Sequence, residues 1–512
     1  MPDTSRKRRR FAALVAACGL ALTVGIAVHA DDPGHPSDRG TPVPHTIGPI
    51  PVTPASHPFG ATSVDLATYG YEEQEFFYSG TANVYDYGAA GKVVVRASGP
   101  YVNRLMVLRP ISARRFSGSV LVELDNMTNR WDLEKMWYSD HDQLMRDGDA
   151  YVGVTSSPMT VASLKAFDPT RYASLSWANP VPPAQRCASP DLNSTPDGST
   201  EGGLAWDILS QAGAALKNGG RDNPLRGLDV ERLYATGYSQ SAGYLTRYIN
   251  AISSRATLAD GRPVYDGYLL GADVLSIPLN SCSAAIPQAD PRNVIQPGHQ
   301  PVIDVQTQTD FYNLGGFEEE RADSDAPGDG YRLYQVPGSS HSSEYTTGLV
   351  PFPADLARAG FTYSYYNCTD AGYSNDFPLW YIFNGAIVNL DAWVRHGIAP
   401  PHAGRIQVTG AGTPNWATVL DAHGNAVGGL RTPWVDVPTQ TYFPTSTPGF
   451  SCSLFGHRVP FDKATLLALY PNHGAYAIPF IAETQQVVRD RWITPEDGEA
   501  IINVAANSSV PA

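Results

Sequence analysis

Short apolar runs alternate along the chain with segments whose apolar residues recur at helical spacing. Eight runs have the length and the β-branched or aromatic content of strands, and they lie at 80–85, 92–96, 119–124, 150–155, 233–235, 264–270, 301–307 and 331–336. Helices are expected at 131–146, at 204–217 and from Ala242 onward. The first two strands flank a glycine-rich turn and should pair, whereas the later alternation favours an α/β fold, a mainly parallel twisted sheet with helices on both faces. In such a sheet, functional residues lie at the carboxyl ends of strands.

The first thirty residues have the pattern of a secretory signal peptide. A basic run over 6–10 precedes an apolar stretch over 11–28, and Ala30 ends a possible cleavage site. The arginine pair before the apolar stretch also resembles a twin-arginine export signal. A membrane anchor is the alternative, because about eighteen apolar residues approach the length that spans a bilayer. We expect a secreted or extracytoplasmic protein without stable membrane insertion after signal removal.

The rest of the chain is expected to form one elaborated unit. Residues 31–57 are rich in proline and glycine and predict an extended N-terminal arm. The core is expected over 58–410, with a cap-like insertion at 156–203 after the fourth strand. Residues 411–512 should pack on the core as a C-terminal extension, since Pro400-Pro401 is too short a linker to separate a domain; an independent domain is the alternative.

Charge narrows the range of partners. Removal of residues 1–30 takes away five basic residues and Asp3, so the net charge changes from −14 to −18. Such a surface repels phosphate backbones and anionic membranes, which argues against nucleic acid as a partner. The sequence contains no His-Glu-x-x-His motif, no phosphate-binding glycine loop and no paired Cys-x-x-Cys, so neither a metal nor another cofactor is expected.

Four cysteines lie beyond the first thirty residues and are widely spaced: Cys187, Cys282, Cys368 and Cys452. In an exported protein, an even number of dispersed cysteines predicts two disulfides. Three pairings are possible and the sequence does not choose among them. Four buried free thiols are the alternative.

The strand-to-helix junction at 233–248 carries the clearest chemical signal. It places Ser239 in the pattern Gly-Tyr-Ser-Gln-Ser, in which Gly237 and Ser241 stand two positions to either side. A strained turn of this kind lifts a serine hydroxyl out of the backbone and tolerates only small flanking residues. The usual pattern has glycine where Ser241 stands, so the turn must accommodate an extra hydroxymethyl group. Ser239 is therefore a candidate nucleophile.

A serine nucleophile needs a histidine base and an acid that orients it. Asp310 follows the strand at 301–307, and His341 follows the strand at 331–336 among small residues, so the order along the chain is serine, acid, histidine. Asp304 lies within its strand and is better explained as structural. The rival acids belong to an acidic run that is also typical of a solvated loop: Glu318, Glu319, Glu320 and Asp323.

An oxyanion hole should combine two backbone N–H groups close to the serine. One is expected from Gln240, directly after Ser239, and the other from the loop after the strand at 119–124. Asn126 and Met127 are the candidates in that loop. A merely polar turn is the alternative, since the glycine usual in such loops is missing.

These motifs together resemble the secreted bacterial α/β-hydrolase-domain family that has a Gly-Tyr-Ser-Gln-Ser-Ala nucleophile elbow. Similar stretches include Pro337-Gly-Ser-Ser-His341 and the segments 70–82 and 425–431, and the resemblance spans 48–504. It implies the α/β-hydrolase fold, one hydrolase unit, and a triad of Ser239, Asp310 and His341. The chain departs from the family at the loop over 126–129, which is less rich in glycine.

The predicted function is that of an exported serine hydrolase. A carboxylic-ester hydrolase that forms an acyl-enzyme, with a small-molecule or polymer ester as substrate, fits best. An acyltransferase or an amide or peptide hydrolase could use the same triad, because the pocket decides the substrate. A non-catalytic binding protein on the same scaffold is the remaining alternative.

Overall fold

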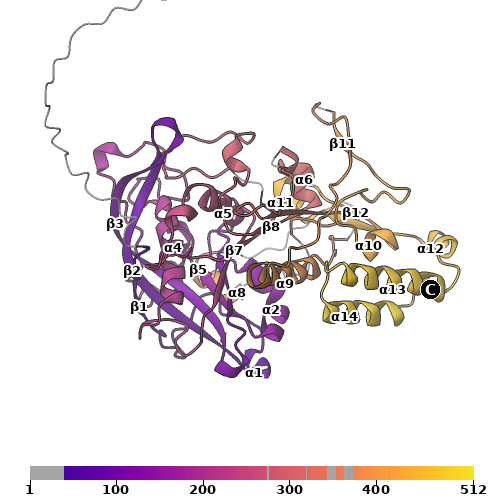
Figure 1. Ribbon diagram of the computed structural model, residues 1–512, viewed down its shortest axis with the longest axis horizontal. Coiled ribbons are helices and arrows are strands. Elements are labelled where there is room, and N and C mark those ends of the chain that lie inside the picture. Colours follow the sequence, from indigo (N-terminus) through magenta and orange to yellow (C-terminus); the bar gives the residue numbers. More distant parts are fainter. Residues whose placement is uncertain are drawn as a thin grey trace, which may run out of the picture. The chain divides into compact units, whose positions relative to one another are not determined.

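A nine-stranded sheet forms the core of the computed structural model (Figure 1). The structure describes residues 40–273, 276–318, 320–342, 353–362, 368, 373–413 and 415–511. The expected signal peptide, the beginning of the expected arm and Glu319 lie outside the described residues. Within the described residues, no helix is long and apolar enough to cross a membrane.

The strand order places an antiparallel half beside a parallel half. The order is β1-β2-β3-β5-β4-β6-β7-β8-β9. β1, β2 and β3 pair antiparallel, β3 also pairs antiparallel with β5, and the other pairs are parallel. The strands are β1 (His45–Ile47), β2 (Tyr71–Tyr87), β3 (Val93–Pro110), β4 (Ser119–Leu124), β5 (Ala150–Val154), β6 (Arg232–Tyr238), β7 (Gly267–Gly271), β8 (Val302–Thr307) and β9 (Tyr331–Val336).

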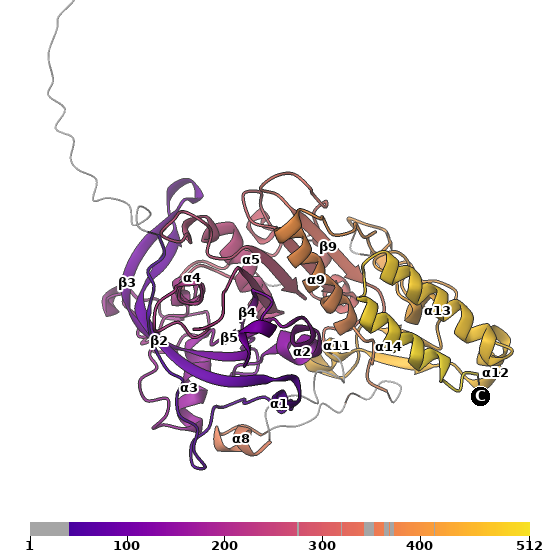
Figure 2. The same ribbon diagram turned by 60° about the horizontal axis from the view of Figure 1, so that its bottom comes forward.

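The main helices cover both faces of this sheet. They are α2 (Lys135–Asp147), α4 (Ala205–Lys217), α5 (Gln240–Ala251) and α9 (Trp380–His396). The connection from β4 through α2 to β5 and the connection from β6 through α5 to β7 run in opposite directions across the sheet. Right-handed crossovers of opposite direction place their helices on opposite faces. α9 lies beside α2 (Figure 2), so these two helices share one face. The predicted α/β class is therefore confirmed.

The remaining helices and short strands are α1 (Leu66–Tyr69), α3 (Pro158–Phe167), α6 (Gln308–Asn313), α8 (Pro353–Arg358), α10 (Pro433–Asp436), α11 (Gly449–Phe455), α12 (Lys463–Leu469), α13 (His473–Arg489), α14 (Pro495–Ala506), β10 (Val408–Thr409), β11 (Ala417–Thr418), β12 (Gln440–Phe443) and β13 (His457–Pro460). The last two helices, α13 and α14, lie side by side (Figures 1 and 2).

The C-terminal segment is joined to the core by a buried carboxylate. Asp497 of α14 accepts hydrogen bonds from Arg146 of α2 and Asn384 of α9, both at 2.8 Å. Because α2 and α9 cover one face of the sheet, the end of the chain packs against that face. The domain boundaries proposed at 57 and 410 stay predictions.

The predicted first hairpin is much longer than its sequence pattern indicated. β2 and β3 pair along nearly their whole lengths, with one irregularity between Val84 and Tyr85. The start of β2 was missed because four consecutive polar residues there resemble a loop. One of them, Glu75, is buried and pairs with Arg104 and Arg171, each at 2.6 Å. The start of β2 is therefore buried through ion pairs with residues distant in the sequence, and it lacks the apolar residues by which a buried strand is usually predicted.

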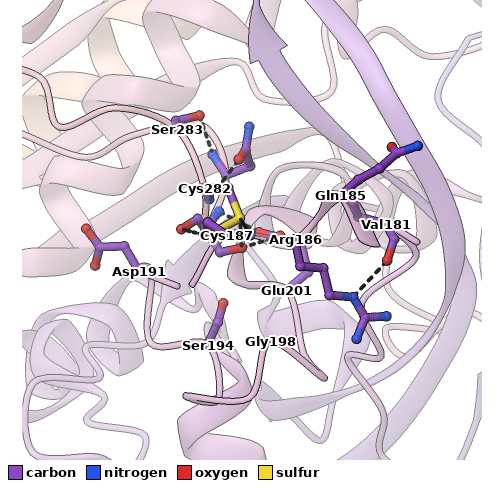
Figure 3. The surroundings of a disulfide bond; sticks show 12 residues. Val181, Gln185, Arg186, Cys187, Asp191, Ser194, Gly198, Glu201, Cys282 and Ser283 are labelled. Carbon is purple, nitrogen blue, oxygen red and sulfur yellow. Dashed lines mark hydrogen bonds between the residues drawn. A yellow bond between two sulfur atoms is a disulfide. The ribbon is translucent and has the colours of Figure 1, made fainter. Parts of the chain in front are cut away.

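The two predicted disulfides are present. Cys187 pairs with Cys282 and Cys368 with Cys452, with Cα–Cα distances of 5.4 and 5.5 Å. The first bond ties the segment that we predicted to be an insertion, 156–203, to the loop after β7 (Figure 3). Close to it, the Glu201 carboxylate accepts hydrogen bonds from the N–H and the hydroxyl of Ser281. The insertion is therefore attached to the loop that follows β7 by a covalent bond and by a buried carboxylate.

Candidate active site

Ser239 occupies a strained turn between β6 and α5. Its backbone has φ 58° and ψ −123°, in the region of positive φ that residues other than glycine rarely adopt. A Cβ at Gly237 would lie 2.9 Å from the carbonyl carbon of Ser241, so only glycine fits there. Strain of this kind persists where the surrounding structure over-determines it, and it is concentrated at functional sites.

The serine at the fifth position of the motif takes part in the turn. The Ser241 side chain is buried, and its hydroxyl oxygen accepts a hydrogen bond from the N–H of Tyr238 at 3.0 Å. The same hydroxyl donates to the Tyr238 carbonyl at 3.1 Å. The extra hydroxymethyl group therefore satisfies buried backbone groups that glycine would leave to other partners.

Asp310 is held at the carboxyl end of β8 by a capping box. Thr307 precedes α6, and both its N–H and its hydroxyl donate to Asp310 Oδ2, at 2.8 and 2.6 Å. The other carboxylate oxygen, Oδ1, lies 2.5 Å from His341 Nδ1. Asp310 is completely buried. Its position is thus fixed on one side by a helix start and on the other by the histidine.

The rival acids are engaged elsewhere. Asp323 contacts His402 at 3.0 Å and Arg405 at 2.7 Å, and Glu320 accepts a hydrogen bond from Gln335. The side chain of Glu318, like Glu319, lies outside the described residues. Among the acids that the structure describes in this group, Asp310 is the one in contact with His341.

Asp304, expected to be structural, lies buried in β8. It accepts a hydrogen bond from the Tyr331 hydroxyl at 3.2 Å. Burial raises the pKa of its carboxyl well above the usual range, and the nearby carboxylates of Asp273 and Asp310 act in the same direction. Burial therefore favours the protonated, neutral form of Asp304 beside Asp310.

His341 is fixed against the serine turn through its own backbone. Its carbonyl accepts a hydrogen bond from the Tyr238 hydroxyl at 2.7 Å, and the two rings meet edge to face at 5.6 Å. Its N–H donates to the Thr309 hydroxyl at 3.1 Å. Since Tyr238 directly precedes Ser239 and Thr309 directly precedes Asp310, these contacts gather all three predicted residues at one edge of the sheet.

The C-terminal segment supports the same loops from outside. The N–H of Ser342 donates to the carbonyl of Leu454 in α11 at 3.0 Å, and the Thr309 hydroxyl donates to the Pro444 carbonyl. The segment after 410 therefore contacts the loops of both the acid and the histidine.

The loop after β4 lies against the serine turn. The Asn126 side chain donates to the Tyr238 carbonyl at 2.8 Å, and the Thr128 hydroxyl donates to the Gln240 side chain at 3.4 Å. The backbone N–H of Asn126, however, donates to the Leu133 carbonyl at 3.0 Å. Because this bond occupies the N–H of Asn126, that N–H is not available to an oxyanion. The contact of Asn126 with the serine turn is made by its side chain instead. Neither Met127 nor Gln240 donates its N–H to another described residue.

Four buried carboxylates lie on either side of this loop in the sequence. Their burial could not be predicted from the sequence, because acidic residues near a loop are usually exposed. Glu123, Asp125, Asp132 and Glu134 lie at the end of β4 and before α2, and burial raises the pKa of each carboxyl. For Glu123 the value rises to about 8. Arg104 neutralises part of the group through contacts that include Asp132 at 3.2 Å. At neutral pH the cluster holds protons that solvated carboxylates would lose.

A small cleft opens beside His341. Its volume is about 20 Å³, and it lies between α2, the start of α9 and the serine turn. The residues that line it are Lys135, Ser139, Tyr238, Ser340, His341, Leu379, Trp380 and Phe383. Lys135 and Ser139 were not predicted as site residues, because a lysine and a serine four residues apart are common on solvent-exposed helix faces.

Within the described ranges, no group of three or more histidine, cysteine, aspartate or glutamate side chains is placed to hold a metal ion. The chemistry that this arrangement supports is that of a buried acid–histidine pair next to a strained serine.

A family model described as "Alpha/beta hydrolase domain" matches residues 46–503. Solved structures that match include a thermostable esterase from Pseudomonas putida, with 13% identity over 54% of this chain and 75% of that one and a TM-score of 0.28. Esterase Est22 is 12% identical over 58% and 82% of the chains, with a TM-score of 0.30. The XC6422 serine hydrolase from Xanthomonas campestris is 12% identical over 55% and 90%, with a TM-score of 0.25. No curated protein matches.

Proposed function

The chain belongs to the alpha/beta hydrolase domain family, and we propose that it is an exported serine hydrolase that cleaves carboxylic esters. The proposal depends most on one observation, the 2.5 Å contact between Asp310 Oδ1 and His341 Nδ1 next to the strained Ser239. Three separate segments of the chain meet there, in the order serine, acid, histidine. A fully buried carboxylate in contact with a histidine ring is the kind of pair that clusters at functional sites.

In the proposed reaction, Ser239 attacks the ester carbonyl while His341 takes the hydroxyl proton and returns it to the leaving alcohol. Asp310 holds the imidazole in the tautomer that accepts this proton and stabilises the imidazolium. Water then attacks the acyl-enzyme by the same route. We assign the stabilisation of the oxyanion to the N–H groups of Gln240 and Met127, because neither N–H has a described acceptor.

Labelling with a fluorophosphonate probe tests the nucleophile. We expect the intact chain to be labelled, Ser239→Ala to be unlabelled, and His341→Ala to react far more slowly because the hydroxyl lacks its base. Ser112→Ala changes an exposed serine outside the site and serves as the matched control. Undiminished labelling of Ser239→Ala would refute the proposal.

Substrate assays separate ester hydrolysis from the related reactions. Hydrolysis of p-nitrophenyl esters without hydrolysis of the matching anilides supports an esterase, and product transfer to an added alcohol in preference to water supports an acyltransferase. If the protein neither reacts with the probe nor hydrolyses any ester, the result supports the alternative of a non-catalytic binding protein on the same scaffold. Mass spectrometry of the exported chain tests cleavage after Ala30.

A further inference from the structure

The cleft beside His341 contains a cation without a counter-ion. Lys135 lies in the first turn of α2, and its Nζ makes neither a hydrogen bond nor an ion pair with any described residue. Its Nζ lies 6.0 Å from the centroid of the Tyr238 ring. Burial lowers the pKa of the amine to about 8, so most of the lysine is still protonated at neutral pH.

A second donor stands on the same face of α2. Residues four apart on a helix are neighbours, so Ser139 lies one turn beyond Lys135 and lines the same cleft. No described residue accepts or donates a hydrogen bond to its hydroxyl. The other walls are largely apolar and include Leu379 and Phe383. An unpaired ammonium in such surroundings is costly unless a ligand supplies the missing charge.

The volume of the cleft limits the size of the anion that can bind there. The cleft is small, about 20 Å³, which favours a small anionic group. A terminal carboxylate is such a group, and its two oxygens can accept from both donors.

The position of the cleft limits where the carboxylate is attached. In the proposed reaction His341 returns its proton to the leaving alcohol, so the alcohol lies on the His341 side of the scissile bond. His341 itself lines the cleft. A carboxylate carried by the alcohol would therefore enter the cleft and point toward Lys135.

We propose that Lys135 and Ser139 bind the carboxylate of the leaving alcohol, so that the preferred substrates are acyl esters of short hydroxy acids. This inference rests on the proposed esterase function. The Ser239 oxygen forms a bond to the acyl carbon as the bond to the hydroxy acid breaks, and the serine proton passes through His341 to the released hydroxyl. Water then hydrolyses the acyl-enzyme, so the products are a carboxylic acid and a hydroxy acid.

The test compares 3-acetoxypropanoate with 3-acetoxypropanamide, which has the same shape and no charge. Acetate release gives kcat/KM for each compound, and the ratio of the two is the readout, since it does not depend on the absolute activity of a variant. We expect a ratio of about tenfold or more for the intact chain, because a charge-assisted hydrogen bond replaces a neutral one. It should arise mainly from KM.

Lys135→Met should bring this ratio close to one, and Ser139→Ala should lower it by less. Lys463→Met removes an exposed lysine from α12, far along the chain, and should leave the ratio unchanged. Equal kcat/KM for the two compounds in the intact chain, or an unaltered ratio in Lys135→Met, overturns the inference while the esterase proposal stands. Loss of probe labelling together with no hydrolysis of either compound overturns both.

Discussion

Replacing Asp310 by asparagine tests the geometry of the acid with almost no change in shape. Thr307 donates two hydrogen bonds to Asp310 Oδ2, so the amide oxygen of Asp310→Asn must stay there to accept them. The amide nitrogen then faces His341 Nδ1, 2.5 Å away in the native protein. That nitrogen donates a proton, which forces the imidazole proton onto Nε2, the atom that must receive the proton of Ser239.

The wrong tautomer should lower kcat by about four orders of magnitude, which corresponds to about 5.5 kcal/mol of transition-state stabilisation. KM should change little, because Asp310 is buried and does not touch the substrate. The measurement is steady-state hydrolysis of a p-nitrophenyl ester, with far-UV circular dichroism and the unfolding midpoint as checks on folding. Asp323→Asn, in which the rival acid loses its charge next to Arg405, is the matched variant and should keep its kcat. If Asp310→Asn retained more than about a tenth of kcat, or if Asp323→Asn lost as much, the acid would be wrongly assigned.

Three further changes test the structure around the site. Burial raises the pKa of the Asp149 carboxyl from 3.8 to about 8, so between these values the folded chain holds a proton that the unfolded chain has lost, and stability falls as the pH rises. Asp149→Asn should remove this loss and stabilise the protein by up to about 4 kcal/mol at pH 7 and by almost nothing near pH 4; a difference in urea unfolding that did not change with pH would contradict this. Ser241→Ala leaves the Tyr238 N–H without its acceptor and should cost about 1–3 kcal/mol in the same assay, whereas an unchanged midpoint would mean that water replaces the hydroxyl. Breaking the Cys187–Cys282 bond with the double change to serine opens a loop of 95 residues and should cost about 4 kcal/mol, which calorimetry would detect as a lower Tm; an unchanged Tm would show that hydrogen bonds alone hold the insertion.

The parallel half of the sheet could be predicted because its strands are short, mostly apolar runs that are buried on both faces. The predicted strands at 119–124 and 331–336 match β4 and β9 to the residue. The antiparallel half was underestimated, because a strand that is buried through ion pairs has no apolar pattern. The helix expected at 131–146 begins only at Lys135, since Asn126 and Leu133 form a bridge that keeps the preceding residues in a loop.

The same distinction applies to the candidate site. Ser239, Asp310 and His341 could be nominated because each is a side chain of the required type within a few residues of the end of a strand, and strand ends meet at one edge of a parallel sheet. The proposed oxyanion groups are backbone amides. Every residue except proline has one, so the residue type does not indicate which amide lacks a partner. That depends on partners such as the Leu133 carbonyl, which takes the N–H of Asn126.

Ser241 shows how a departure from a motif can carry structural information. Glycine is usual at this position because the turn is tight. From the sequence, the hydroxymethyl group of Ser241 therefore appeared only as extra volume that the turn had to accommodate. In the folded chain the turn leaves the N–H of Tyr238 buried, and the hydroxyl of Ser241 is the group that accepts it. Tyr238 in turn positions both the His341 carbonyl and the Asn126 side chain. Substitution at 241 should therefore be felt at the histidine and at the oxyanion loop as well as at the serine, because all three depend on the orientation of one tyrosine.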